Sequence, residues 1–196
     1  MRKKALSSKG YTLIEFVMVM IVVSVIGVII MSILSSTLRG TKKTNVISSI
    51  RTSGNQAITQ MAKLIRFAKK FEGVSKNGTI NTYVLDCTQT VIGLTPTPTP
   101  VAYKYLKFKA EDDGQIIFTC DDANSTIASN TASLIDTDIV KVADNNCWFT
   151  CNQDRVTTNP VIRVYFELRQ AGDSAFPESQ FSIAFETSVV LKNLVK

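Results

Sequence analysis

Residues 11–34 decide the fold, and they read YTLIEFVMVMIVVSVIGVIIMSIL. Residues 16–34 carry no charge, and only Ser24, Gly27 and Ser32 interrupt their apolar side chains. About 20 apolar residues in a helix span the hydrocarbon core of a bilayer. A secretory signal peptide has a shorter apolar core, of about 7–15 residues. The stretch therefore predicts a transmembrane helix rather than a cleaved secretory signal.

The charges on either side of this span predict its orientation. No acid lies within residues 1–10, and basic residues gather there: Arg2, Lys3, Lys4 and Lys9. The positive-inside rule places this end in the cytoplasm and everything after residue 40 outside the cytoplasmic membrane. Three further basic residues follow the span and weaken this bias: Arg39, Lys42 and Lys43.

Glu15 is the one acid at the edge of the span. A carboxylate in a transmembrane helix is disfavoured, by up to ~3 kcal/mol at the bilayer centre, and usually has a partner. Two interpretations stay open. In the first, Glu15 lies at the membrane interface and reaches water. In the second, a cation meets it inside the membrane.

The heptapeptide Lys9-Gly10-Tyr11-Thr12-Leu13-Ile14-Glu15, after a short basic leader and before a long apolar helix, resembles the start of type IV prepilins and pseudopilins. The resemblance implies that a prepilin peptidase cuts after Gly10 and methylates Tyr11. It also implies that Glu15 helps the subunit enter a growing filament. Tyr11 stands where the family usually has Phe, and the apolar helix has no Pro, which favours a minor pilin or pseudopilin.

Cleavage after Gly10 would leave a free amine on Tyr11, and an α-amine is largely protonated at neutral pH. The amine would be the missing cation, because Glu15 of an incoming subunit could meet Tyr11 of its neighbour. Such a pair is strong where the dielectric constant is low. The implied partners are other pilin or pseudopilin subunits, the peptidase, the inner-membrane assembly platform and, before assembly, membrane lipid.

Beyond the span the pattern becomes amphipathic. Apolar or small residues recur three and four positions apart, which is one face of a helix: Ile47, Ile50, Gly54, Ala57, Ile58, Met61, Leu64, Ile65 and Ala68. We expect one helix over about 12–72, with Gly73 as its C-terminal stop. Another face carries the basic stripe Lys63, Arg66 and Lys70, which is either solvated or meets the acidic heads of neighbouring subunits.

The remaining chain favours strands, so the expected fold class is α+β: a pilin-like long helix packed on one antiparallel sheet. The divisions are a leader (1–10), a transmembrane or filament-core helix (11–35), its amphipathic continuation (36–73) and a β-rich head (74–196). Residues 111–114 predict a hairpin turn, and residues 144–146 and 171–173 predict loops. The expected strands are Thr79–Asp86, Ala102–Ala110, Gln115–Cys120, Leu134–Ala143, Val161–Leu168 and Gln180–Lys192. The repeated Thr-Pro of residues 95–100 predicts an exposed insertion, or else a glycosylated or docking loop.

Four cysteines, Cys87, Cys120, Cys147 and Cys151, allow three disulfide pairings. One of these closes a small loop between Cys147 and Cys151 and leaves Cys87 with Cys120, and we take it as the working expectation. A four-cysteine metal site is the alternative, although the spacing lacks paired C-x₂-C elements.

Composition excludes much chemistry. The chain has 196 residues and no His, so it can hold no Ser-His-Asp or Cys-His nucleophile and no His-ligated zinc. Residues 1–73 carry 12 basic and 2 acidic side chains, whereas residues 76–196 carry 10 basic and 14 acidic ones. An acidic head argues against nucleic-acid binding. We expect no enzymatic activity and no cofactor. Calcium at the acidic pairs 112/113, 121/122 or 136/138 is the alternative to plain solvated turns.

The resulting expectation is a structural filament subunit of a type IV pilus, a type II secretion system or a DNA-uptake machine. The alternative is a membrane-anchored extracellular binding module or adhesin that never assembles. Such a module would keep residues 1–10 and tolerate Glu15→Ala.

Overall fold

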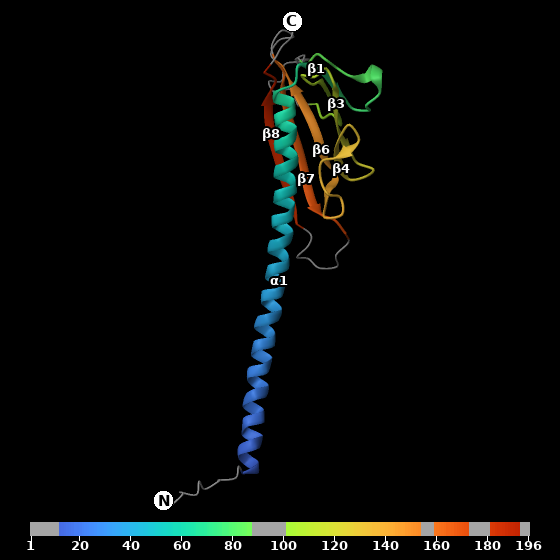
Figure 1. Ribbon diagram of the computed structural model, residues 1–196. Coiled ribbons are helices and arrows are strands. Elements are labelled where there is room, and N and C mark those ends of the chain that lie inside the picture. The colour runs from blue at the N-terminus through green and yellow to red at the C-terminus, as the bar shows by residue number, and fades with distance from the viewer. Residues whose placement is uncertain (1–11, 88–100, 154–158, 173–180, 193–196) are drawn as a thin grey trace, which may run out of the picture. The chain divides into compact units, whose positions relative to one another are not determined.

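The computed structural model describes residues 12–87, 101–153, 159–172 and 181–192, and it divides into two compact units, residues 1–44 and 45–196. One helix, α1 (Leu13–Arg66), begins in the first unit and ends in the second. Among the described residues after it, the chain forms eight strands and a short 3₁₀ helix (Figure 1). The predicted α+β class is confirmed.

The second half of α1 packs through the predicted apolar face. Its buried positions follow the helical spacing: Ile50, Gly54, Ala57, Met61 and Ile65. Gly54 allows the closest approach, because a Cβ atom there would lie 2.2 Å from the ring of Phe185. Phe185 is itself buried and stacks on Phe166 with 5.4 Å between ring centroids. A small residue in the helix thus admits a large one from the sheet.

The predicted helix end is wrong. α1 ends at Arg66, and the chain then enters β1 (Lys70–Ser75). The N–H of Lys69 donates to the carbonyl of Lys109 on another strand (2.8 Å), so sheet pairing has already replaced helical bonding there. Gly73 lies at a bulge of β1 with φ +120°, where a Cβ atom would come within 2.8 Å of the Val84 carbonyl oxygen. Its conformational freedom serves the strand and not a helix cap.

Five strands form the first antiparallel sheet, in the order β1-β2-β3-β4-β5. After β1 come η1 (Ile80–Thr82), β2 (Tyr105–Lys109), β3 (Gln115–Asp121), β4 (Thr126–Ser129) and β5 (Ala132–Ser133). The predicted hairpin turn at 111–114 is confirmed: Lys109 pairs with Gln115, and Asp113 adopts φ 64°.

Three longer strands form a second antiparallel sheet, β6 (Val140–Asn152), β7 (Val161–Gln170) and β8 (Ser182–Val190), in that order. The expectation of one sheet was therefore wrong. Figure 1 shows β7 and β8 running beside the second half of α1. The backbone groups of Tyr103 and Phe149 bond reciprocally at 2.8 Å and connect the region of the first sheet to the second.

Three local predictions also need correction. Residues 79–86 form η1 and a single bridge, Val74 with Val84, instead of a strand. Residues 144–146 lie in β6, where the register shifts and Asn145 takes φ 56°, so the expected loop is a bulge. The expected strand over 134–143 begins only at Val140. The loop at 171–173 and the Thr-Pro segment 95–100 fall partly or wholly outside the residues described.

Candidate functional site

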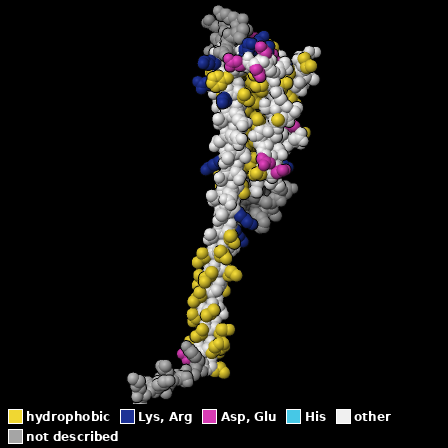
Figure 2. Space-filling view, viewed as in Figure 1, with side chains coloured by type: hydrophobic (Ala, Val, Ile, Leu, Met, Phe, Trp, Pro, Cys, Tyr) yellow, Lys and Arg dark blue, Asp and Glu magenta, His cyan; other side chains and the backbone are white. Residues whose placement is uncertain are grey.

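The first half of α1 has an apolar surface on every side. Each large hydrophobic residue from Leu13 to Leu38 is at least 46% exposed in the chain itself. Figure 2 shows these side chains gathered along this segment. The helix is long and apolar enough to cross a membrane. A folded chain rarely leaves so large an apolar surface in water, so this segment marks a membrane or protein contact.

Two hydroxyl groups within this segment, those of Ser24 and Thr37, donate to carbonyl groups of the helix itself. The Oγ of Ser24 donates to the Met20 carbonyl (2.7 Å), and the Oγ1 of Thr37 donates to the Ile33 carbonyl (2.9 Å). Polar groups in a membrane need such internal partners because the hydrocarbon offers none. Both hydroxyls are therefore compatible with a dry environment.

The start of α1 places Glu15 in the first turn of the helix. Thr12 is the N-cap: its Oγ1 accepts the N–H of Glu15 at 3.4 Å, and its carbonyl accepts the N–H of Phe16 at 3.2 Å. Thr-x-x-Glu is the sequence of a capping box, and an acid in the first turn is favoured by the helix dipole. The Thr-x-x-Glu spacing is the sequence signal for this helix start, and the charge of Glu15 alone does not indicate it.

The other residues of the predicted processing site, Gly10 and Tyr11, lie outside the described residues. Cleavage after Gly10, methylation of Tyr11 and the Glu15–Tyr11 ion pair therefore stay predictions.

All four cysteines form disulfides, but in a different pairing from the expected one. Cys87 bonds Cys151 and Cys120 bonds Cys147, with Cα–Cα distances of 5.5 and 5.6 Å. Cys120 lies on β3 and Cys147 on β6, so this bond joins the two sheets. The expected Cys147–Cys151 loop fails because both residues lie on one extended strand, four positions apart. Buried disulfides indicate an oxidising, extracytoplasmic environment for the head.

Three of the carboxylates considered for calcium have side-chain partners: Asp113, Asp121 and Asp122. Asp113 accepts from Lys69 (2.7 Å) and lies 3.0 Å from Lys109, and these hydrogen bonds, Lys69 first, lower the pKa of its carboxyl. Hydrogen bonds from Asn124 lower the pKa of Asp121. Asp122 pairs with Lys104 at 2.8 Å. Over the residues that the structure describes, no group of three acids or cysteines is arranged to hold a metal ion.

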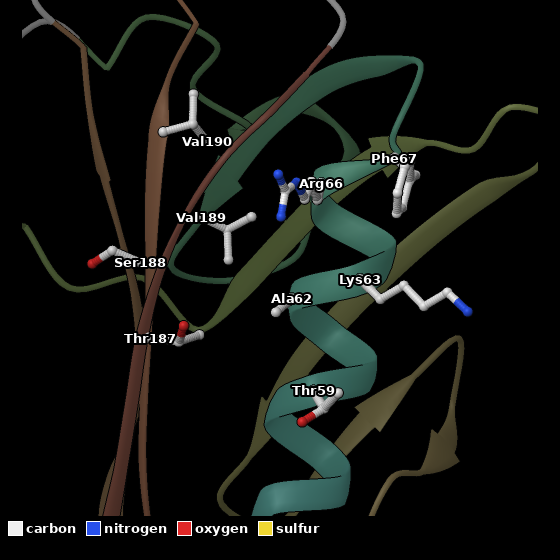
Figure 3. A pocket seen from close by; sticks show the side chains of 9 residues that line it. All are labelled: Thr59, Ala62, Lys63, Arg66, Phe67, Thr187, Ser188, Val189 and Val190. Carbon is white, nitrogen blue, oxygen red and sulfur yellow. The ribbon is translucent and has the colours of Figure 1, made fainter.

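A groove of about 660 Å³ lies between the end of α1 and β8 (Figure 3). We call it the α1–β8 groove. Arg66 projects from the helix toward β8, whereas Lys63 extends from the opposite flank of the helix. Thr187 and Val189 point from β8 toward the helix. Of the predicted basic stripe, Lys63 and Arg66 line this groove, and Lys70 belongs to β1.

A second hollow, of about 760 Å³, lies over β3, β4 and the segment before β6. Hydroxyl side chains dominate its lining, together with the acids Asp121 and Asp138 and the base Lys141.

Comparisons with protein families, curated proteins and solved structures found no match for this chain.

Proposed function

We propose that this chain is a structural subunit of an extracytoplasmic filament, of the minor-pilin or pseudopilin type, serving a pilus, a secretion system or a DNA-uptake machine. One observation carries the proposal: the first half of α1 exposes apolar side chains on all sides and has a single carboxylate, Glu15, in its first turn. The prepilin-like stretch from Lys9 to Glu15 supports it.

An all-round apolar helix is suited to exchange a membrane for a helical bundle. Lipid tails are about as apolar as leucine side chains, so moving such a helix from lipid into a bundle changes the environment of its side chains little. Glu15 is the exception, because its carboxylate gains only where a cation meets it. Its pairing with a neighbouring Tyr11 amine would therefore select the register of the bundle.

The proposal also fixes topology and partners. Residues 1–10 face the cytoplasm, the helix spans the membrane, and the disulfide-bonded head lies outside before the subunit enters the filament. The partners are the prepilin peptidase, the assembly platform, other subunits and membrane lipid. The chain performs no catalysis itself; it is the peptidase's substrate.

The test is an intact mass and N-terminal sequence of protein taken from native membranes, combined with filament counts for Glu15→Gln. We expect a chain that begins at Tyr11, is heavier by one methyl group, and fails to assemble once Glu15 is neutralised. Glu111→Gln is the matched control, because Glu111 is an exposed acid on the head. A chain beginning at Met1, with Glu15→Gln indistinguishable from wild type, would favour a membrane-anchored binding module instead.

A further inference from the structure

The α1–β8 groove carries positive charge that the described part of the chain does not neutralise. Neither Lys63 nor Arg66 takes part in an ion pair there, whereas six other Lys and Arg residues do. Arg66 lines the groove together with the apolar side chains of Ala62 and Val189. A guanidinium in such a setting suits a carboxylate, which it can bind through two parallel hydrogen bonds.

Unneutralised negative charge lies on the segment between β5 and β6. Asp136 and Asp138 are both exposed, and neither belongs to an ion pair among the residues described. Asp136 Oδ1 accepts the backbone N–H of Asp138 (3.0 Å), which shapes the segment into a tight turn. We call residues 136–138 the acidic loop.

The groove and the acidic loop lie at opposite ends of the second sheet. Val190 lines the groove. At the other end of β8, Ser182 pairs with Arg169, and the nearby Ala171 N–H donates to the carbonyl of Ile139, which adjoins the acidic loop. The nearest groove residue on β8, Thr187, is five residue steps from Ser182, about 17 Å at ~3.4 Å per residue. Arg66 lies farther still, because its carbonyl accepts the N–H of Lys192, beyond the end of β8. The acidic loop of one molecule therefore cannot reach its own groove.

We propose that the acidic loop of one copy of this chain docks at the α1–β8 groove of another copy, with one acid facing Arg66 on the β8 side of the helix and the other reaching Lys63 on the opposite flank. The inference rests on the proposed function and names a contact between its subunits. Because the two surfaces differ and lie at opposite ends, the contact is head-to-tail and leaves a free groove and a free loop at the ends. Such a contact continues into a filament unless its rotation happens to close a ring.

Zero-length carbodiimide cross-linking of wild-type filaments tests the contact directly. The reagent joins a lysine amine to a carboxylate only where they touch, so a Lys63 link to Asp136 or Asp138 must join two copies. We expect this linked peptide when intact filaments are treated with the reagent. It should be absent when the filaments are dissociated in detergent before the reagent is added.

A charge swap tests whether the contact matters for assembly. We expect Lys63→Glu with Arg66→Glu to lower filament number at least about tenfold, as for truncated interfacial charge pairs. Adding Asp136→Lys and Asp138→Lys should restore assembly. Arg51→Glu is the matched control, because Arg51 is an exposed cation on the same helix outside the groove. Thermal unfolding of each variant's head checks that it folds.

The outcomes separate the two proposals. Filaments that lack the cross-link, that tolerate the double reversal, or that are lost equally with Arg51→Glu, overturn the docking contact while leaving the filament function intact. A double reversal that folds but is not rescued by the swap also overturns it. If wild-type protein keeps residues 1–10 and forms no filaments, the proposed function itself fails.

Discussion

The two halves of α1 both carry many apolar side chains, but they cover them in different ways. From Leu13 to Leu38 every large apolar side chain is exposed, whereas from Ile50 to Ile65 the apolar face is buried under the sheets. Both halves are uninterrupted helix, so backbone propensity does not separate them. The second half finds its partner within the chain, and the first half must find one outside it. The helix therefore joins a segment that packs on the chain's own sheets to a segment whose apolar surface needs a membrane or protein contact.

A charge placed in each half should break only the function of that half, and we expect this to be the largest effect. Val25→Asp puts a carboxylate near the centre of the apolar span, at a cost of about 3 kcal/mol, or roughly 100-fold in membrane insertion. Ile50→Asp buries a carboxylate without a partner and should unfold the head. Alkaline extraction measures insertion, and near-ultraviolet circular dichroism measures head folding.

Each variant of that pair is the other's control. Val25→Asp should leave the unfolding temperature of the head unchanged, and Ile50→Asp should remain in the membrane pellet. A head that unfolds in Val25→Asp would mean that the two halves depend on each other for folding, contrary to the comparison.

Removing the disulfide between the sheets should weaken the head alone. Cys120→Ser with Cys147→Ser frees a loop with a sequence separation of 27. The expected loss is about 3 kcal/mol of unfolding free energy, because the unfolded chain regains loop entropy. Denaturant unfolding of the purified chain in detergent measures it. Membrane insertion serves as the internal control, and an unchanged midpoint would mean that β3 and β6 hold together without the bond.

The same glycine substitution should act differently in the two halves. Gly54→Ala drives a Cβ atom into the ring of Phe185, whereas Gly40→Ala meets nothing within 4 Å. Overpacking costs about 1–3 kcal/mol, and the gain in helix propensity returns about 1 kcal/mol. The unfolding temperature of the head should therefore fall for Gly54→Ala but not for Gly40→Ala. A rise for both variants would show that Phe185 moves aside freely.

These contrasts also show which features local sequence determines. The buried face of α1 could be predicted because apolar residues spaced three and four positions apart lie on one face of any helix. The hairpin at residues 111–114 was predicted because turn residues separate two strands that pair with each other. The N-cap bond from the Glu15 N–H to Thr12 is equally local, because it depends only on a Thr three positions before the Glu.

Features that depend on distant pairing could not be predicted this way. The helix ends before Lys69 because that residue bonds Lys109, which is 40 positions away in the sequence. The disulfide pairing depends on which strands face each other across the two sheets. The strand pattern in the sequence predicts a single sheet, so it cannot indicate which cysteines meet. The α1–β8 groove needs β8 beside the end of α1, although Lys63 and Arg66 themselves were recognised as a basic stripe.

The smallest predicted effect concerns the place where helix gives way to strand. Lys69, and then Lys109, lower the pKa of Asp113 by hydrogen bonding its carboxylate. The Asp113 carboxylate therefore binds a proton more weakly in the folded chain than in the unfolded chain. The stabilisation from this carboxylate is complete above its ordinary pKa, near pH 4, and is lost as pH falls through the lowered pKa.

Because these groups are largely exposed, Asp113→Asn should lower the unfolding temperature only slightly at neutral pH. The difference from wild type should vanish in acid. Asp112→Asn is the control, because Asp112 is one position away and outside this ion pair; its unfolding temperature should depend on pH as that of wild type does. If Asp112→Asn and Asp113→Asn both lose the dependence on acid pH, the Lys69–Asp113 pair is not the cause of that dependence.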